Sequence, residues 1–185
     1  MASLPNAKTL TYDQWLKLPL TAGGREEVVN GEITFMPPNK WPHAQVVRNL
    51  AAAFLRQIDP AAVELVFSDF GLVIRRDPLT CREPDLALFD RGAMVVQDGY
   101  FHSPPQLAIA VLSPSETRRQ IEEKLRDYES IGVPEVWLVS PEAGTLERLL
   151  PEGGRLRRSA IVAEGSLTPQ RFPNVSIDIL AIWPE

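Results

Sequence analysis

The chain has 185 residues, 44% of them hydrophobic, which suits a single compact domain over residues 1–185 and is too little for two domains of ordinary size. Its longest apolar runs, residues 50–55 and 107–112, are far short of a membrane span, and its one cysteine, Cys81, excludes an internal disulfide and argues against a Cys-rich zinc site. The formal net charge of −5 argues against a protein that coats nucleic acid nonspecifically, because phosphate contacts supply most of that affinity. We therefore expect a cytoplasmic protein with no membrane partner.

Residues 11–18 have the pattern of a short helix, with Thr11 as the N-cap and Gln14 completing a capping box. Two strand-like runs within residues 26–36 flank Asn30-Gly31, which is the strongest short hairpin signal. The N-terminal part therefore predicts a helical turn followed by a β-hairpin.

A long helix is predicted over residues 42–58, because the apolar residues recur there at helical spacing. Pro42 suits the first turn of this helix, and Asp59-Pro60 ends it. The segments that follow are typical of strands at 63–67, 71–75 and 84–89, and of a loop at 90–105.

The run at residues 106–112 is nearly all apolar, which predicts a central strand covered on both faces. Ser113 as a cap, Pro114 in the first position and Glu116 in the third predict the start of a helix that ends near Gly132. The remaining segments predict a strand at 135–140, a hairpin from 145–150 and 154–160, and a last strand or helical turn at 174–183. Strands mixed with two long helices indicate an α/β layered domain with a mixed sheet.

Two charged residues lie beside the predicted core. Asp85 follows Pro84 at the mouth of an apolar strand, where it is either a turn-forming cap or a ligand for a hard cation, which prefers carboxylate oxygen. Lys124 lies about 60° from the apolar stripe of its helix, so its amine either stays in water or reaches inward.

The phrases "NGE", "EPDLALF", "LAIAVLSPS" and "EKLRDYESIGVPEVWLV", in this order, resemble the Uma family, bacterial proteins assigned to the PD-(D/E)XK restriction-endonuclease fold. The resemblance runs from about Tyr12 to the C-terminal strand, which is nearly the whole chain. It implies a three-layer α/β fold, a mixed sheet flanked by helices, with an endonuclease site at the sheet edge.

The resemblance also implies site residues. Asp85 matches the family's Pro-Asp carboxylate, and Lys124 matches its lysine, displaced onto the helix. In the family pattern, Mg²⁺ or Mn²⁺ is held by two carboxylates and a backbone carbonyl, which is here that of Val111. The lysine orients or deprotonates the attacking water. Here Ala110 replaces the second acid. A unit charge about 4 Å from a charged partner is worth roughly 4 kcal/mol at an effective dielectric near 20, so we expect weakened metal binding.

Other acids are candidates to replace the missing one. Glu27 matches an acid in the family's hairpin motif and is the best of them. Glu83 lies two residues before Asp85, so strand alternation could aim both side chains to one side. Glu32 and Glu116 are further candidates, although Glu83 and Glu116 are more typical of a surface charge and a helix cap.

His43 falls on a family histidine, just after Pro42 at the start of the long helix. By spacing it shares a helix face with Val47 and Leu50. It is therefore either a buried neighbour of the core or a residue that faces the metal pocket from the first helical turn.

Two groups of basic residues are candidates for nucleic-acid contact, although composition favours solvated faces: Arg75, Arg76 and Arg82, and Arg118, Arg119, Lys124 and Arg126. Three functions are consistent with the sequence. They are a metal-dependent endonuclease acting on DNA, a catalytically inactive relative that binds nucleic acid or a protein, and an assembly module. Because nucleases of this fold commonly pair to cut two strands, we expect a homo-oligomer such as a dimer.

Overall fold

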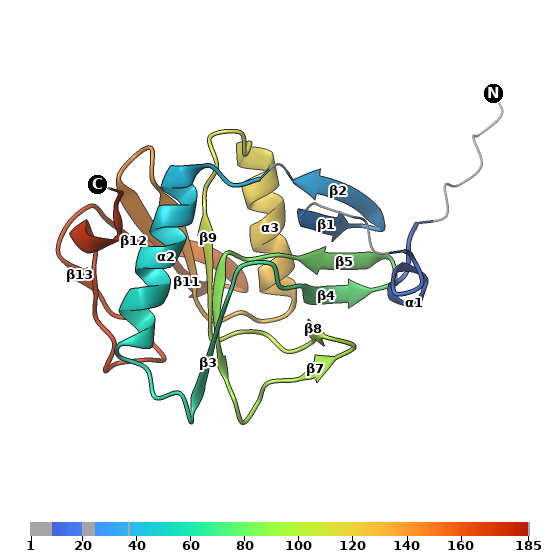
Figure 1. Ribbon diagram of the computed structural model, residues 1–185, viewed down its shortest axis with the longest axis horizontal. Helices are drawn as coiled ribbons and strands as arrows, with labels where there is room; N and C mark the ends of the chain where they lie inside the picture. Colours follow the sequence, from blue (N-terminus) through green and yellow to red (C-terminus); the bar gives the residue numbers. More distant parts are fainter. Residues whose placement is uncertain (1–8, 20–24, 37, 185) are drawn as a thin grey trace.

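The computed structural model describes residues 9–19, 25–36 and 38–184 of the chain (Figure 1). Its helices are α1 (Tyr12–Trp15), α2 (Trp41–Leu55), α3 (Arg118–Ser130) and the 3-10 turn η1 (Leu180–Ile182). Its strands are β1 (Arg25–Val29), β2 (Glu32–Met36), β3 (Val63–Phe67), β4 (Leu72–Arg76), β5 (Leu79–Arg82), β6 (Leu86–Asp90), β7 (Val96–Gln97), β8 (Tyr100–Phe101), β9 (Leu107–Val111), β10 (Val136–Ser140), β11 (Thr145–Glu152), β12 (Arg155–Val162), β13 (Ser166–Leu167) and β14 (Ile177–Asp178).

Most strands belong to two six-stranded sheets, which we name the hairpin sheet and the central sheet. The hairpin sheet has the order β2-β1-β5-β4-β8-β7, the central sheet has the order β12-β11-β10-β9-β6-β3, and β13 pairs with β14. In the central sheet β9 and β10 run parallel, whereas the other neighbours run antiparallel. The predicted mixed sheet is therefore present, and a second sheet lies beside it.

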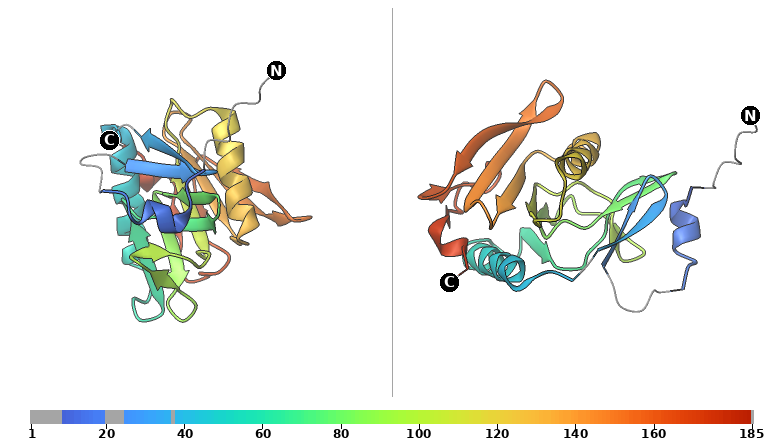
Figure 2. Two further views of the ribbon diagram at one scale, coloured as in Figure 1. Left: turned by 90° about the vertical axis from the view of Figure 1, so that its right-hand side faces the viewer. Right: turned by 90° about the horizontal axis from the view of Figure 1, so that it is seen from above.

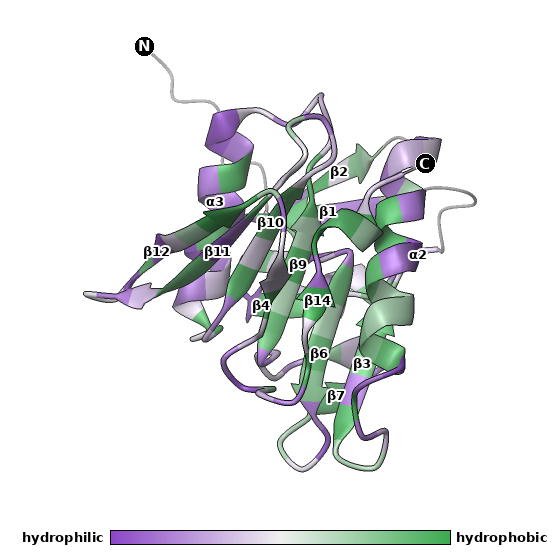
Figure 3. Ribbon diagram, turned by 90° about the vertical axis from the view of Figure 1, so that its left-hand side faces the viewer, coloured by the Kyte–Doolittle hydropathy of each residue, from purple (hydrophilic) through white to green (hydrophobic). Residues whose placement is uncertain are grey.

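Helices α2 and α3 lie on opposite faces of the central sheet (Figures 1 and 2). Alternate residues of β9 point to these two faces, as the pleat requires. Ile109 and Val111 pack in the apolar cluster under α2, whereas Ala108 and Ala110 pack in the cluster under α3. Every residue of β9 is buried, and Figure 3 shows β9 and β6 as hydrophobic strands. These contacts confirm the predicted central strand and the three-layer arrangement.

The N-terminal elements form as their local sequence predicts. In α1 the amide of Gln14 donates to Thr11 Oγ1 and the amide of Thr11 donates to Gln14 Oε1, which is the predicted capping box. The β1–β2 hairpin turns at Asn30 and Gly31, with φ values of 52° and 81°. These left-handed conformations are the ones that a tight hairpin turn requires.

Helix α3 begins later than predicted. Residues Ser113 to Glu116 do form a turn, in which Glu116 N donates to the Ser113 carbonyl at 2.9 Å and Ser113 N donates to Glu116 Oε2 at 2.9 Å. The helix, however, begins at Arg118. The prediction of a helix start at Ser113 is wrong, because a second capping box made by Thr117 and Gln120 lies four residues further along.

The sequence predicted no strand at residues 79–82, where β5 pairs with β1 and β4. All four residues of β5 are buried, including Thr80 and Arg82. A buried arginine hides the strand from a hydrophobic pattern, because its charged partners come from distant parts of the chain. Two further short strands, β7 and β8, lie in the predicted loop at 90–105. No helix within the described segments is long and apolar enough to cross a membrane.

Gly31 suits the hairpin turn for a second reason besides its left-handed backbone, because residues 9 and 10 leave no room for a side chain there. A Cβ atom at Gly31 would lie 2.6 Å from Thr9 Cβ and 2.7 Å from Leu10 N, whereas Gly99 has a similar φ of 85° and nothing within 4 Å of a Cβ. Gly99→Ala should lower the free energy of unfolding by only about 1 kcal/mol, the cost of the left-handed backbone conformation. Gly31→Ala should lower it by about 2 kcal/mol more, because of the close contacts of the added Cβ. Urea unfolding of the two variants measures the difference, and equal losses would show that the close approach of residues 9 and 10 is unimportant.

Candidate functional site

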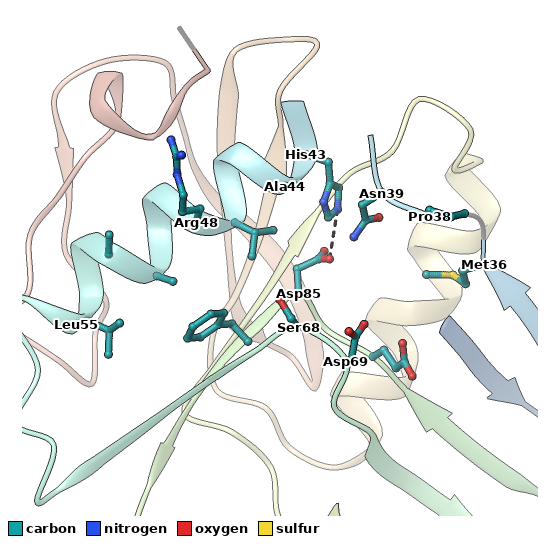
Figure 4. Close-up of a pocket in the computed structure, with 15 residues that line it drawn as sticks. Met36, Pro38, Asn39, His43, Ala44, Arg48, Leu55, Ser68, Asp69 and Asp85 are labelled. Carbon is teal, nitrogen blue, oxygen red and sulfur yellow. Dashed lines mark ion pairs between the residues drawn. The ribbon is translucent and has the colours of Figure 1, made fainter. Parts of the chain in front are cut away.

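Asp85 lies between β5 and β6, where the pairing of β6 with β9 fixes its backbone. Its amide donates to the Ile109 carbonyl at 3.1 Å, and its carbonyl accepts from Ser68 N at 3.3 Å. The carboxylate is held at both oxygens, since Oδ2 accepts from Val111 N at 2.8 Å and Oδ1 lies 3.2 Å from His43 Nε2 (Figure 4). Asp85 is only 8% exposed, so these contacts orient a largely desolvated carboxylate.

His43 reaches Asp85 from the first turn of α2, with Pro42 immediately before it. The imidazole is 8% exposed, and within the part of the chain that the structure describes its Nδ1 has no hydrogen-bond partner. Of the two interpretations of His43, the structure therefore supports the one in which it faces the Asp85 pocket.

Lys124 points inward from α3 and is 8% exposed. Its Nζ donates to Glu116 Oε1 at 2.9 Å, and the other oxygen of Glu116 accepts from Ser113 N. The amine is therefore neutralised by a carboxylate that lies before the helix.

Asp85 and Lys124 line one cavity of about 570 Å³, which we name the Lys124 cavity; it is also lined by His43, Glu83 and Val111. A second cavity of about 800 Å³, the α2 groove, continues from it along α2 (Figure 4). Both cavities share His43, Glu83 and Asp85. The structure thus brings together six of the residues that the sequence singled out, since Glu116 lines the Lys124 cavity as well.

Ala110 does not share this cavity lining. Its side chain is 2% exposed and packs in the apolar cluster under α3, together with Ala108 and Tyr128. The Tyr128 hydroxyl is fully buried and has no hydrogen-bond partner among the described residues. Burial raises the pKa of Tyr128 far above its ordinary value, and the nearby carboxylates of Glu27 and Asp85 raise it further. The cluster therefore holds an uncharged tyrosine beside the methyl group at position 110.

Glu27 lines neither cavity. Its Oε2 accepts from Arg82 Nη1 at 2.9 Å, and its Oε1 accepts from Glu83 N at 3.1 Å. Arg82 also donates from Nε to Asp127 Oδ2 at 2.7 Å. Burial alone would lower the pKa of Arg82, but the two carboxylates more than offset it and raise that pKa. We name Glu27, Arg82 and Asp127 the buried ion triad; it joins β1, β5 and α3.

The fit of Mg²⁺ or Mn²⁺ can be tested on the donors present. Four carboxylates, those of Glu83, Asp85, Glu116 and Glu142, line the Lys124 cavity with His43, and oxygen donors of this kind suit a hard cation. However, among residues 9–19, 25–36 and 38–184 no three His, Cys, Asp or Glu side chains are grouped closely enough to hold a metal ion. The donor chemistry is therefore suitable, but the residues as placed do not fit a metal ion.

The two basic groups do not form free cationic patches. In the first, Arg75 donates to Asn30 Oδ1 at 2.6 Å, Arg76 pairs with Asp13 at 2.8 Å, and Arg82 is buried in the ion triad. In the second group, Lys124 is buried and Arg118 pairs with Glu122 on the surface. Arg119 and Arg126 are exposed and have no ion pair within the described part of the chain.

Sequence reasoning missed the role of Asp127, and of Tyr128 it predicted only a place on the apolar stripe of the helix, where the residue is indeed buried. Both follow Lys124 at helical spacing of three and four residues, so they share its side of α3. That spacing was visible in the sequence, but the partners of Asp127 on β5 and of Tyr128 in the core were not.

Comparisons with known proteins agree on the fold. A sequence model of the Uma2 family, described as "Putative restriction endonuclease", matches residues 11–180. The crystal structure of a "putative nuclease belonging to DUF820" from Anabaena variabilis ATCC 29413 superposes with a TM-score of 0.76, covers 94% of this chain and 97% of that chain, and shares 17% sequence identity. No curated protein sequence matches the chain. The expected restriction-endonuclease-like α/β fold is confirmed.

Removing one carboxylate of the buried ion triad tests its structural role. Glu27→Gln keeps the size of the side chain but leaves Arg82 with one counter-charge in a site where Glu27 is 4% exposed. We expect the free energy of unfolding to fall by about 3 kcal/mol, as for other broken buried ion pairs. Glu32→Gln, an exposed acid on β2, should change it by less than about 0.5 kcal/mol. Equal effects in chemical unfolding would show that the triad does not stabilise the fold.

The hydroxyl of Tyr128 gives a second test. Because a buried, unpaired hydroxyl costs about 1–3 kcal/mol, Tyr128→Phe should leave the free energy of unfolding unchanged or raise it by about 1 kcal/mol. Tyr12→Phe removes a hydroxyl that donates to Asp98 Oδ2 at 3.2 Å and should lower it by about 1 kcal/mol. Thermal unfolding of both variants checks the opposite signs, and a marked loss in Tyr128→Phe would reveal a hydrogen bond to that hydroxyl.

Proposed function

The chain belongs to the Uma2 family, and on that premise we propose that it is a nuclease acting on the phosphodiester backbone of DNA, with hydrolysis weakened by the loss of one acid. The observation that carries the proposal is that Asp85 and Lys124 line one cavity although they lie 39 positions apart (124 minus 85) in the sequence. A carboxylate that can help to hold a cation and an amine that can offset charge on a phosphate are two of the groups from which a phosphodiester-hydrolysis site is built.

The chain's own residues have distinct roles in this proposal. Val111 N and His43 hold the two oxygens of Asp85, so the carboxylate keeps one orientation toward the cavity. Lys124 would offset the negative charge that develops on the phosphate oxygens, because an ammonium group in a cavity screened from water interacts strongly with an oxyanion. His43 Nδ1 is a further polar group near the Asp85 carboxylate.

The weakness of the proposed site has a structural cause. The family resemblance implies an acid at position 110, and the side chain there is a methyl group in an apolar cluster. Because the donors present do not fit Mg²⁺ or Mn²⁺, no catalytic step of this chain is assigned to a metal. We propose that the native chain binds Mg²⁺ or Mn²⁺ weakly and cleaves DNA slowly.

The same observations favour a second candidate function, a catalytically inactive nuclease-fold protein that binds nucleic acid or another protein. Lys124 is already neutralised by Glu116, and the described residues do not contain three metal-binding side chains in one group. A cavity on a nuclease fold can bind a ligand even where it lacks the charges that hydrolysis requires.

Restoring the acid distinguishes the two functions. Calorimetric titration of Mn²⁺ and Mg²⁺ into Ala110→Glu should show binding at least about tenfold tighter than in the native chain, because position 110 directly precedes Val111 on the cavity wall and a longer side chain there adds a negative charge next to the cavity. The same variant should cleave a labelled DNA duplex in Mn²⁺, and cleavage should disappear when Asp85→Asn or Lys124→Ala is added.

Ala110→Gln is the matched control, because glutamine has nearly the size of glutamate but no charge. It should bind metal no more tightly than the native chain. Tight binding by the native chain that Asp85→Asn abolishes would instead indicate an intact enzyme. Folded variants that all fail to bind metal or cleave DNA would leave the inactive binding protein as the function.

A further inference from the structure

The contact between Glu116 and Lys124 does not serve to cap α3. The helix begins at Arg118, and its first turn is capped by Thr117 and Gln120, each of which accepts a backbone hydrogen bond from the other. Glu116 therefore lies outside the helix, and its carboxylate is not needed for the N-terminal amides.

The carboxylate of Glu116 is nevertheless held in a fixed position. Oε1 accepts from Lys124 Nζ at 2.9 Å, and Oε2 accepts from Ser113 N at 2.9 Å. The side chains of Glu116 and Lys124 are 20% and 10% exposed, so water screens this pair less than it screens a surface ion pair. A partly buried pair with both carboxylate oxygens engaged is not a chance surface contact.

The pair lies on the wall of the Lys124 cavity, where a substrate would have to enter. A carboxylate oxygen and a phosphate oxygen make the same kind of charge-assisted hydrogen bond to an ammonium group, so they compete for it. Acids also outnumber bases among the charged residues that line this cavity: Glu83, Asp85, Glu116 and Glu142 against Lys40 and Lys124. A phosphodiester therefore meets a cavity whose buried cation is already occupied by an internal anion.

We infer that the Glu116 carboxylate competes with a phosphate group of nucleic acid for the Lys124 ammonium group. Nucleic acid can therefore bind Lys124 only when the Glu116–Lys124 ion pair opens. The inference rests on the proposed function, because it takes the ligand of this cavity to be a phosphodiester. It makes Glu116 a positioning residue that acts through Lys124, and it explains why a cavity with a buried lysine would bind a polyanion weakly.

The test is the affinity of the full-length protein for a short fluorescent DNA strand, measured by anisotropy in EDTA so that no divalent ion takes part. Glu116→Gln removes the competing charge and should bind the strand about tenfold more tightly than the native chain. Glu122→Gln is the matched control, because it lies on α3, the helix that carries Lys124, pairs with Arg118 at the surface and changes the net charge equally. It should stay within about twofold of the native affinity, since exposed charges are screened by salt.

Two further variants connect the gain to Lys124 and protect the test against misfolding. Glu116→Gln combined with Lys124→Gln leaves no buried unpaired charge and should show no gain. Glu116→Asp keeps the charge but shortens the side chain by one methylene group, so it should give an intermediate gain of about threefold. Thermal unfolding of each variant checks that the compared proteins are folded.

Equal affinities of the native chain and Glu116→Gln, or an equal gain in Glu122→Gln, would overturn the inference, as would the absence of DNA binding in all variants. These outcomes are separate from those of the proposed function. If Ala110→Glu binds metal and cleaves DNA but Glu116→Gln binds the DNA strand no more tightly than the native chain, only the inference about Glu116 is contradicted. If Glu116→Gln binds the DNA strand more tightly but Ala110→Glu does not bind metal, only the proposed nuclease activity is contradicted.

Discussion

The site depends on the buried ion triad of Glu27, Arg82 and Asp127. Arg82 lies three residues before Asp85, and Asp127 lies one helical turn after Lys124, so this pairing holds the two halves of the site against each other. A buried arginine is costly unless carboxylates surround it, and here they come from β1 and α3. The buried ion triad that ties the hairpin sheet to α3 is thus also the constraint that turns Asp85 and Lys124 toward one cavity.

The cavity itself is more acidic than a nucleic-acid site usually is, and the two charges at its centre, those of Asp85 and Lys124, are already engaged within the chain. Asp85 is bound by Val111 N and His43, and Lys124 is bound by Glu116. Position 110 provides a methyl group in the apolar cluster that also contains Tyr128. In this protein with the family's fold, internal contacts therefore occupy the charged groups of the candidate site.

Local sequence signals predicted the elements whose cause is local. The Asn30-Gly31 turn, the Thr11 capping box and the fully apolar β9 were all read correctly, because turn geometry, capping and burial on both faces leave a direct pattern in neighbouring residues. Two features were misread, each for its own reason. Strand β5 is hidden by Arg82, whose partners are distant, and α3 starts at the second of two overlapping capping patterns.

By itself, the sequence determined the α/β class, the family resemblance, the absence of an acid at position 110 and the identity of Asp85 and Lys124 as candidate residues, because composition, periodicity and motif order are local properties of the chain. Only the tertiary structure decided which charges meet: that Glu27 pairs with Arg82, that His43 contacts Asp85, and that Glu116 binds Lys124. The physical reason is that a charge in a poorly solvated place takes whichever opposite charge the packing of strands and helices brings within reach, and that distance is not encoded in the spacing of residues along the chain.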